Sequence, residues 1–145
     1  MGCKIWLLYL LDEEGKRMQK CRVLLVADHV PIRAALRTLL AHYHDIRIVG
    51  KASDGQQAIE LMASCQPDVI LMDINMPRMN GMEATARIKK SRREAVIIGL
   101  CAVEEPHHTE AILKAGAVAV ISKHHLNDLY STIQRACVKR PSSPA

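Results

Sequence analysis

From residue 21 onward, short apolar segments of strand length alternate with longer segments of helical periodicity. The apolar segments are rich in β-branched residues and contain few charges. Continuous apolarity over such short segments is typical of strands that are buried on both faces, as in parallel sheets. The predicted strands are residues 22–27, 46–52, 69–73, 95–101 and 118–122.

A candidate helix follows each of these apolar segments. Proline in the first turn and a capping aspartate are signals for a helix start, and the predicted helices begin near Pro31, Asp54, Gly81, Pro106 and Leu126. Alternating strands and helices with short connections predict right-handed crossovers and an open, doubly wound sheet. We therefore expect a single α/β domain of the flavodoxin-like (βα)5 type, with a five-stranded parallel sheet.

The length and composition are consistent with one globular domain. The chain has 145 residues, of which 49% are hydrophobic and 24% are charged, as in soluble proteins. We place the domain at residues 21–138, between an extension at 1–20 and a polar tail at 139–145. The extension is consistent either with an appended helix or with a gene start assigned too far upstream.

The extension contains one apolar run, at residues 5–11. This run is too short to span a bilayer, and charged residues follow it where a signal peptide would have a cleavage site of small residues. We therefore expect neither export nor membrane insertion, and a cytoplasmic location.

The net charge of +5 raises the possibility of a nucleic-acid partner. The cations are scattered apart from two clusters. The cluster at residues 87–93 lies at the end of a predicted helix, where cations complement the helix dipole. The cluster at 135–140 leads into the polar tail and has no aromatic residues that could stack on bases. We therefore expect no direct binding of nucleic acid by this chain.

The cysteines and histidines do not form a recognisable metal motif. The five cysteines lie far apart and never form a C-x-x-C pair, so the sequence predicts reduced thiols and neither a zinc site nor a redox motif. The paired histidines have no Cys, Asp or Glu partner at metal-ligand spacing. We interpret them as surface residues.

The candidate chemistry lies where the predicted strands end. The carboxyl ends of parallel strands meet at one edge of the sheet, where ligands bind in this type of fold. The residues at that edge are Ala27, Asp28, Asp73, Cys101 and Lys123. A carboxylate beside a buried strand is costly unless it is paired or binds a cation. Two carboxylates suit Mg²⁺, and a lysine suits an ion pair or a phosphoryl oxygen.

The simplest alternative is that Asp73 only caps the turn that follows it. Asn75 and Pro77 are typical turn residues. The position of Asp73 alone does not distinguish this structural role from magnesium and phosphate chemistry.

Several spaced motifs together resemble the receiver domain of bacterial two-component response regulators. They are residues 23–29 (VLLVADH), 68–77 (DVILMDINMP), 80–84 (NGMEA), 114–117 (KAGA) and 121–123 (ISK). The resemblance extends over about residues 22–137. Residues 46–50 and the absence of proline after Lys123 are most similar to the subclass that usually precedes a helix-turn-helix DNA-binding domain.

The resemblance implies a phosphorelay function. Asp73 would accept a phosphoryl group from a sensor histidine kinase or a phosphotransfer protein, and Lys123 would contact that group. Asp28, Asp73 and the backbone carbonyl of Asn75 would hold Mg²⁺. The output would be a changed protein-protein surface, on the fourth helix, fifth strand and fifth helix or on the first and fifth helices, and a homodimer is possible.

Three positions depart from the family pattern. Ala27 replaces the first member of an acid pair, which implies weaker Mg²⁺ binding. Cys101 stands where the family usually has Thr or Ser, and Val120 stands at the aromatic switch position.

Two other functions remain as alternatives. The departures are consistent with a phosphorylation-independent pseudo-receiver that acts as an interaction or dimerisation module. A phosphatase with an aspartyl-phosphate intermediate would need an acid two residues after Asp73, and Asn75 cannot act as a general acid. We therefore expect no enzymatic turnover of an external substrate.

Overall fold

The computed structural model of the chain describes residues 20–76, 79–102 and 106–138. Most of the predicted extension and the whole predicted tail lie outside these ranges. The strands are β1 (Cys21–Val26), β2 (Ile46–Ala52), β3 (Val69–Asp73), β4 (Val96–Cys101) and β5 (Ala119–Ser122). The helices are α2 (Val30–Leu40), α3 (Gly55–Cys65), α4 (Gly81–Ser91), α5 (Pro106–Ala115), the 3₁₀ helix η1 (Leu126–Asp128) and α6 (Leu129–Val138).

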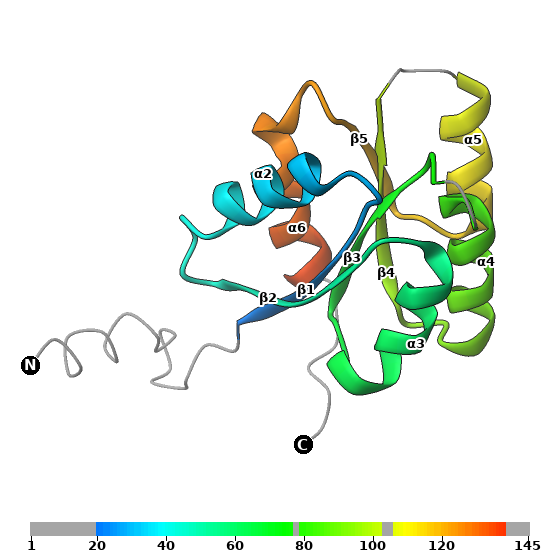
Figure 1. Cartoon of the computed structure of the whole chain (residues 1–145), viewed down its shortest axis with the longest axis horizontal. Coiled ribbons are helices and arrows are strands. Elements are labelled where there is room, and N and C mark those ends of the chain that lie inside the picture. The colour runs from blue at the N-terminus through cyan, green and yellow to red at the C-terminus, as the bar shows by residue number, and fades with distance from the viewer. Residues whose placement is uncertain (1–19, 77–78, 103–105, 139–145) are drawn as a thin grey trace, which may run out of the picture.

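The strands form one parallel sheet in the order β2-β1-β3-β4-β5 (Figure 1). From β1 the chain first adds β2 on one side, and it then adds β3, β4 and β5 on the other. The winding direction therefore reverses between β1 and β3, and in such sheets a crevice forms at this point, outside the carboxyl ends of the strands. This topology confirms the predicted doubly wound, flavodoxin-like fold.

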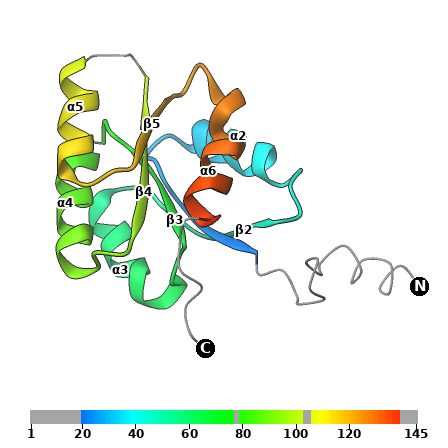
Figure 2. The same ribbon diagram turned by 180° about the vertical axis from the view of Figure 1, so that it is seen from behind.

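Helices cover both faces of the sheet. Figures 1 and 2 show α2 and α6 on one face and α3, α4 and α5 on the other. Alternate residues of a strand point to opposite faces: Val23 and Leu25 of β1 pack in the cluster that includes Leu36 and Ile133, whereas Leu24 packs in the other cluster. Burial on both faces explains why the central strands β3 and β4 are almost entirely apolar, whereas the edge strand β2 carries Arg47 and Lys51 at exposed positions.

The predicted element boundaries agree closely with the structure. The predicted ranges of β2 and β3 are identical to the observed ones, and the starts of the other three strands differ by one residue. The helix expected near Leu126 begins instead as the single turn η1, closed by a hydrogen bond from the Leu129 N–H to the Leu126 carbonyl. The α-helical part starts only at Leu129, whose side chain is fully buried.

One prediction about the cysteines was wrong. Cys21, at the start of β1, and Cys137, in the last turn of α6, form a disulfide across a sequence separation of 116 residues, whereas reduced thiols had been expected. In the described part of the chain, Cys65 and Cys101 take no part in a disulfide. No spacing rule could find the pair, because the two residues approach only when α6 packs against the sheet. A cross-link that closes a loop of about 100 residues contributes roughly 4 to 5 kcal/mol in the chain-entropy model.

A polar and aromatic contact joins α6 to the α2–β2 loop. The rings of Tyr43 and Tyr130 stack with centroids 3.5 Å apart. The Tyr130 hydroxyl donates to the Asp45 carboxylate at 2.7 Å, and the Gln134 side-chain amide donates to the same hydroxyl at 2.8 Å. Burial, and then the neighbouring Asp45, raise the pKa of Tyr130 to about 12.

No helix in the described ranges combines the length and the apolarity that crossing a bilayer requires.

We predict that Tyr130→Phe lowers the free energy of unfolding by about 1 to 2 kcal/mol at neutral pH, because the hydrogen bond to a carboxylate is lost. The pKa of Tyr130 rises from 10.0 to about 12 on folding, so its contribution is complete below pH 10 and is lost as the pH rises towards 12. Urea unfolding of both proteins at several pH values measures this difference. Tyr43→Phe, which keeps the ring stack, is the control. A difference that stays constant from neutral to strongly alkaline pH would contradict the assignment.

Candidate functional site

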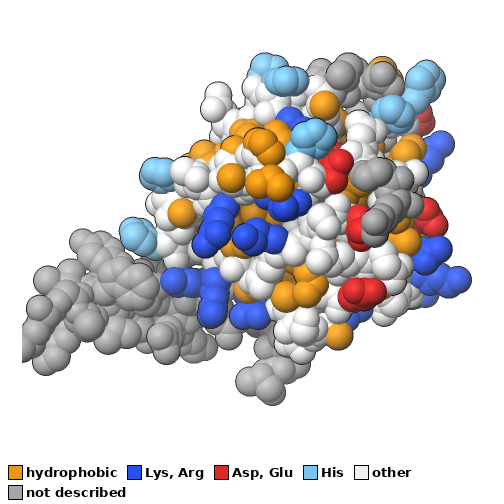
Figure 3. Space-filling view, viewed as in Figure 1, with side chains coloured by type: hydrophobic (Ala, Val, Ile, Leu, Met, Phe, Trp, Pro, Cys, Tyr) orange, Lys and Arg blue, Asp and Glu red, His pale blue; other side chains and the backbone are white. Residues whose placement is uncertain are grey.

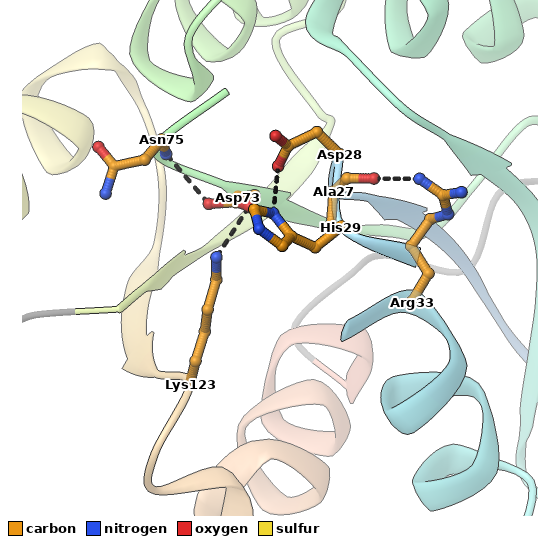
Figure 4. A network of polar contacts seen from close by, with 7 residues as sticks. All are labelled: Ala27, Asp28, His29, Arg33, Asp73, Asn75 and Lys123. Carbon is orange, nitrogen blue, oxygen red and sulfur yellow. Dashed lines mark hydrogen bonds and ion pairs between the residues drawn. The ribbon is translucent and has the colours of Figure 1, made fainter. Parts of the chain in front are cut away.

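The centre of the site is the carboxylate of Asp73, the last residue of β3. Its side chain is completely buried, and the Lys123 ammonium lies 2.8 Å from Oδ2. The backbone N–H of Asn75 donates to Oδ1 at 3.0 Å. Figure 4 shows both contacts converging on Asp73, while the side-chain amide of Asn75 points away. Asp73 therefore does cap the following turn through the Asn75 N–H, as the simpler alternative requires. It also forms an ion pair with Lys123, which turn capping alone does not explain.

The order of the strands brings Lys123 to Asp73. Lys123 follows β5, and its backbone N–H donates to the Cys101 carbonyl of β4 at 2.7 Å. This contact fixes the residue at the strand end, from which its side chain reaches past β4 to β3. Only 12% of the Lys123 side chain is exposed, so the ion pair is largely shielded from water. The predicted convergence of these two residues is confirmed.

Ala27 and Asp28 follow β1 at the same edge of the sheet. Ala27 is buried, and its N–H donates to the Ala52 carbonyl at 3.0 Å. The Asp28 side chain is 25% exposed, and its Oδ1 lies 3.2 Å from Nδ1 of His29. Strands β1 and β3 pair in parallel, with Val26 opposite Met72, so Asp28 and Asp73 both follow this pair at the same edge of the sheet (Figure 4). The two carboxylates are hard oxygen ligands of the kind that Mg²⁺ prefers, whereas the Ala27 methyl group offers no ligand.

Two residues of this region were not predicted as site residues from the sequence. Arg33, in the first turns of α2, donates from Nη1 to the Ala27 carbonyl at 2.6 Å, as Figure 4 shows. His29 lies against Asp28 but is mostly exposed. Neither belongs to a spacing that indicates chemistry. They reach the site because α2 begins only a few residues after β1 ends.

Gly81 allows helix α4 to begin directly against the end of β3. A Cβ atom at this position would lie 2.3 Å from the Asp73 carbonyl oxygen and 2.9 Å from the Ile74 Cα, and both distances are shorter than real contacts. The Gly81 N–H donates to the Ile74 carbonyl at 3.0 Å, and Asn80 caps the helix by accepting from the Glu83 N–H at 2.8 Å. The Asn-Gly pair of the sequence motif therefore holds α4 close to Asp73.

The comparison with known protein families agrees with this geometry. The family model for the response regulator receiver domain matches residues 23–134. The chain belongs to this family.

Individual relatives are similar over the same part of this receiver domain. The nitrate/nitrite response regulator protein NarL of Escherichia coli K12 is 36% identical over 101 residues, which is 70% of this chain and 47% of NarL. The transcriptional regulatory protein LiaR of Bacillus subtilis is 37% identical over 102 residues, which is 70% of this chain and 48% of LiaR. The chain thus spans about half the length of these curated relatives.

Solved receiver domains have the same fold. The response regulator domain of Thermotoga maritima CheB has a TM-score of 0.78 at 31% identity, and the match covers 85% of this chain and all of that one. The receiver domain of a putative response regulator NarL from Mycobacterium tuberculosis has a TM-score of 0.79 at 27% identity, covering 84% of this chain and 99% of that one. The matches to NarL proteins and to a LuxR-family regulator confirm the expected resemblance to this subclass of receivers.

Cys101 and Val120, the two residues that the resemblance places at switch positions, lie beside one hollow. Cys101 is buried at the end of β4, and Val120 lies in β5, packed only partly against the core. The hollow has a volume of about 470 Å³, and it is lined by Cys101, Pro106, Thr109, Glu110, Leu113, Val120 and Ser122. Val120, where the resemblance leads us to expect an aromatic residue, is thus one of the residues that line this space.

A third group of cations lies on the surface of the receiver. The sequence had indicated only the clusters at residues 87–93 and 135–140, with the other cations scattered. Arg33, Arg37 and Lys51 line one groove along α2, together with His42. Figure 3 shows Lys and Arg side chains gathered over α2 and β2 on this face. Helix α2 contains no acidic residue, so the groove is cationic, and it begins beside the Ala27 carbonyl that Arg33 contacts.

We predict that Lys123→Met lowers the free energy of unfolding by about 3 to 5 kcal/mol, because a buried carboxylate loses its charged partner. Adding Asp73→Asn to this variant should restore most of the loss, because the unpaired charge is then gone. Urea unfolding of the two single variants and the double variant measures the coupling. Lys114→Met, in an exposed ion pair with Glu110, is the control and should have little effect. Additive single effects would contradict the assigned ion pair.

Proposed function

We propose that this receiver accepts a phosphoryl group on Asp73 from a sensor histidine kinase or a phosphotransfer protein of the cytoplasm. The observation that carries the proposal is the buried Asp73 carboxylate, held by Lys123 in the crevice at the strand ends. A carboxylate oxygen of Asp73 would attack the phosphorus in line, while the bond to the donor nitrogen breaks. Lys123 would then stabilise the negative charge on the phosphoryl oxygens.

The oxygen ligands of the site fit Mg²⁺, with one charge fewer than the family pattern provides. Asp28, Asp73 and the backbone carbonyl of Asn75 would hold the ion. When bound, the ion would neutralise charge on the phosphoryl oxygens. Because Ala27 removes a carboxylate near the cation, we expect Mg²⁺ affinity to fall roughly ten- to a hundredfold below that of a site with the complete acid pair.

The cationic groove along α2 supports an approach of the phosphoryl donor from that side. A phosphohistidine carries negative charge, and a cluster of cations raises the association rate of an oppositely charged partner. Arg33 lies at the end of the groove nearest the site, where it contacts the Ala27 carbonyl. The groove would therefore bring a negatively charged donor close to Asp73.

The output surface would lie over α5 and β5. The hollow beside Cys101 and Val120 is located there, and Leu113 and Val118 are unusually exposed for large apolar residues, at 43% and 54%. A shift of β4 or α5 after phosphorylation could fill or close this hollow and thereby change the exposed apolar surface.

The second candidate function is a phosphorylation-independent interaction or dimerisation module. A thiol is a weaker hydrogen-bond donor than the usual hydroxyl, and Val120 cannot make the movement of an aromatic switch residue. These two substitutions favour a receiver whose surface depends less on phosphorylation. Turnover of an external substrate is not part of either proposal.

We expect acetyl phosphate with Mg²⁺ to add one phosphoryl group to the protein, and Asp73→Asn to abolish this addition. Intact-mass spectrometry measures the adduct. Asp68→Asn, which changes an aspartate at the opposite end of β3, is the matched control and should be labelled like the parent. No Asp73-dependent adduct at high Mg²⁺ would reject phosphoacceptance and leave the phosphorylation-independent module.

A further prediction concerns the missing acid. Ala27→Asp should raise Mg²⁺ affinity by about ten- to a hundredfold, because it adds a carboxylate next to the metal ligands. Calorimetric titration with Mg²⁺ measures the affinity of each protein. Ala34→Asp, which adds the same charge to an exposed position of α2, should have a much smaller effect. Equal gains in the two variants would mean that only net charge matters.

A further inference from the structure

A second cluster of metal-ligating side chains lies at the end of the sheet opposite Asp73. It consists of Cys21 at the start of β1, Asp68 immediately before β3, and Cys137 in the last turn of α6. Because β1 and β3 pair in parallel, their amino ends meet, and α6 ends beside them. The two sulfurs and a carboxylate oxygen all lie within 4.8 Å of one another. Phosphorelay chemistry uses none of these residues.

The Asp68 carboxylate is held in place by the backbone of β1. Its Oδ2 accepts from the Arg22 N–H at 2.9 Å, and the Asp68 N–H donates to the Arg22 carbonyl at 2.7 Å. The Arg22 guanidinium donates from Nη2 to the Cys65 carbonyl at 2.7 Å. A ligand whose orientation is fixed by a hydrogen bond from an adjacent residue is typical of metal sites.

We propose that the reduced form of this cluster binds a thiophilic divalent cation, with zinc as the best match. Two thiolates and a carboxylate are ligands that Zn²⁺ accepts, whereas Mg²⁺ prefers oxygen ligands alone. Binding releases the thiol protons to solvent. Three protein ligands leave the fourth tetrahedral position open to water or to a partner's side chain. The spacing of the cysteines in the sequence hides this site, because its ligands come from three separate elements.

The Cys21–Cys137 disulfide is the oxidised form of the same cluster. A small-molecule disulfide can accept two electrons from the two thiolates: the Cys21–Cys137 bond forms, the oxidant is reduced to two thiolates, and the cation leaves. Disulfide sulfurs carry no thiolate charge and bind Zn²⁺ poorly. The Cα atoms are 6.4 Å apart, towards the upper end of the range for disulfides. Side-chain rotation can therefore separate the sulfurs to the spacing of about 3.8 Å that two Zn–S bonds require.

The test uses the full chain in reduced form, titrated with Co²⁺ and then with competing Zn²⁺. We expect stoichiometric binding with a thiolate-to-cobalt charge-transfer absorption. Cys137→Ser should lower the affinity at least about a hundredfold, and Asp68→Asn about tenfold. Cys65→Ser, which changes a cysteine outside the cluster, should bind like the parent. The oxidised parent should not bind.

Circular dichroism shows whether each variant folds. If a variant does not fold, a labelling experiment on the parent protein tests the same proposal. Zn²⁺ should protect Cys21 and Cys137 of the reduced parent from an alkylating reagent and leave Cys65 reactive, as read by peptide mass spectrometry. The proposal is overturned if no stoichiometric binding occurs, if Cys137→Ser binds like the parent, or if binding depends on Cys65. Phosphorylation of Asp73 does not enter this test, so its failure leaves the proposed function untouched.

Discussion

The buried negative charge of Asp73 is the constraint on which the rest of the site depends. A carboxylate that is fully removed from water is strongly destabilising unless charged or hydrogen-bonded partners compensate it. The Lys123 ammonium and the Asn75 N–H provide that compensation for the two oxygens. The partners can only meet because the parallel sheet brings the ends of β3 and β5 to one edge, with α4 held close by the absence of a side chain at Gly81.

Lys123 and a metal ion would compete for the same carboxylate, and Ala27 affects the balance between them. With an acid at that position, Mg²⁺ would gain attraction from another carboxylate, while Lys123 is farther along the sheet. With alanine, the ion pair between Asp73 and Lys123 becomes relatively more favourable. Arg33 adds positive charge beside the Ala27 carbonyl, which further disfavours a cation. If the site binds Mg²⁺ as proposed, alanine at position 27 would therefore favour the metal-free arrangement over the metal-bound one.

The features that could be predicted from the sequence are those encoded by local pattern or by the strand-end rule. The residue patterns of β2 and β3 predicted the boundaries of both strands, and the strand-end rule brought Asp73 and Lys123 together across 50 residues. Features that depend on how helices pack were missed. Arg33 reaches the site through the direction of α2, and Cys137 meets Cys21 only after α6 crosses the sheet. Neither contact leaves a periodicity or a spacing in the chain.

Helix α6 is anchored more firmly than α5, which bears on where the proposed response to Asp73 would occur. Helix α6 is fixed along its length: Leu129 and Ile133 are fully buried, Tyr130 binds Asp45, and Cys137 is tied to β1. Moving it would disrupt all of these contacts together. By contrast, α5 has one buried residue, Ile112, and borders an open hollow. A rearrangement that started at the strand ends would therefore meet less resistance at α5 than at α6, because space is available beside α5 and fewer contacts would be lost.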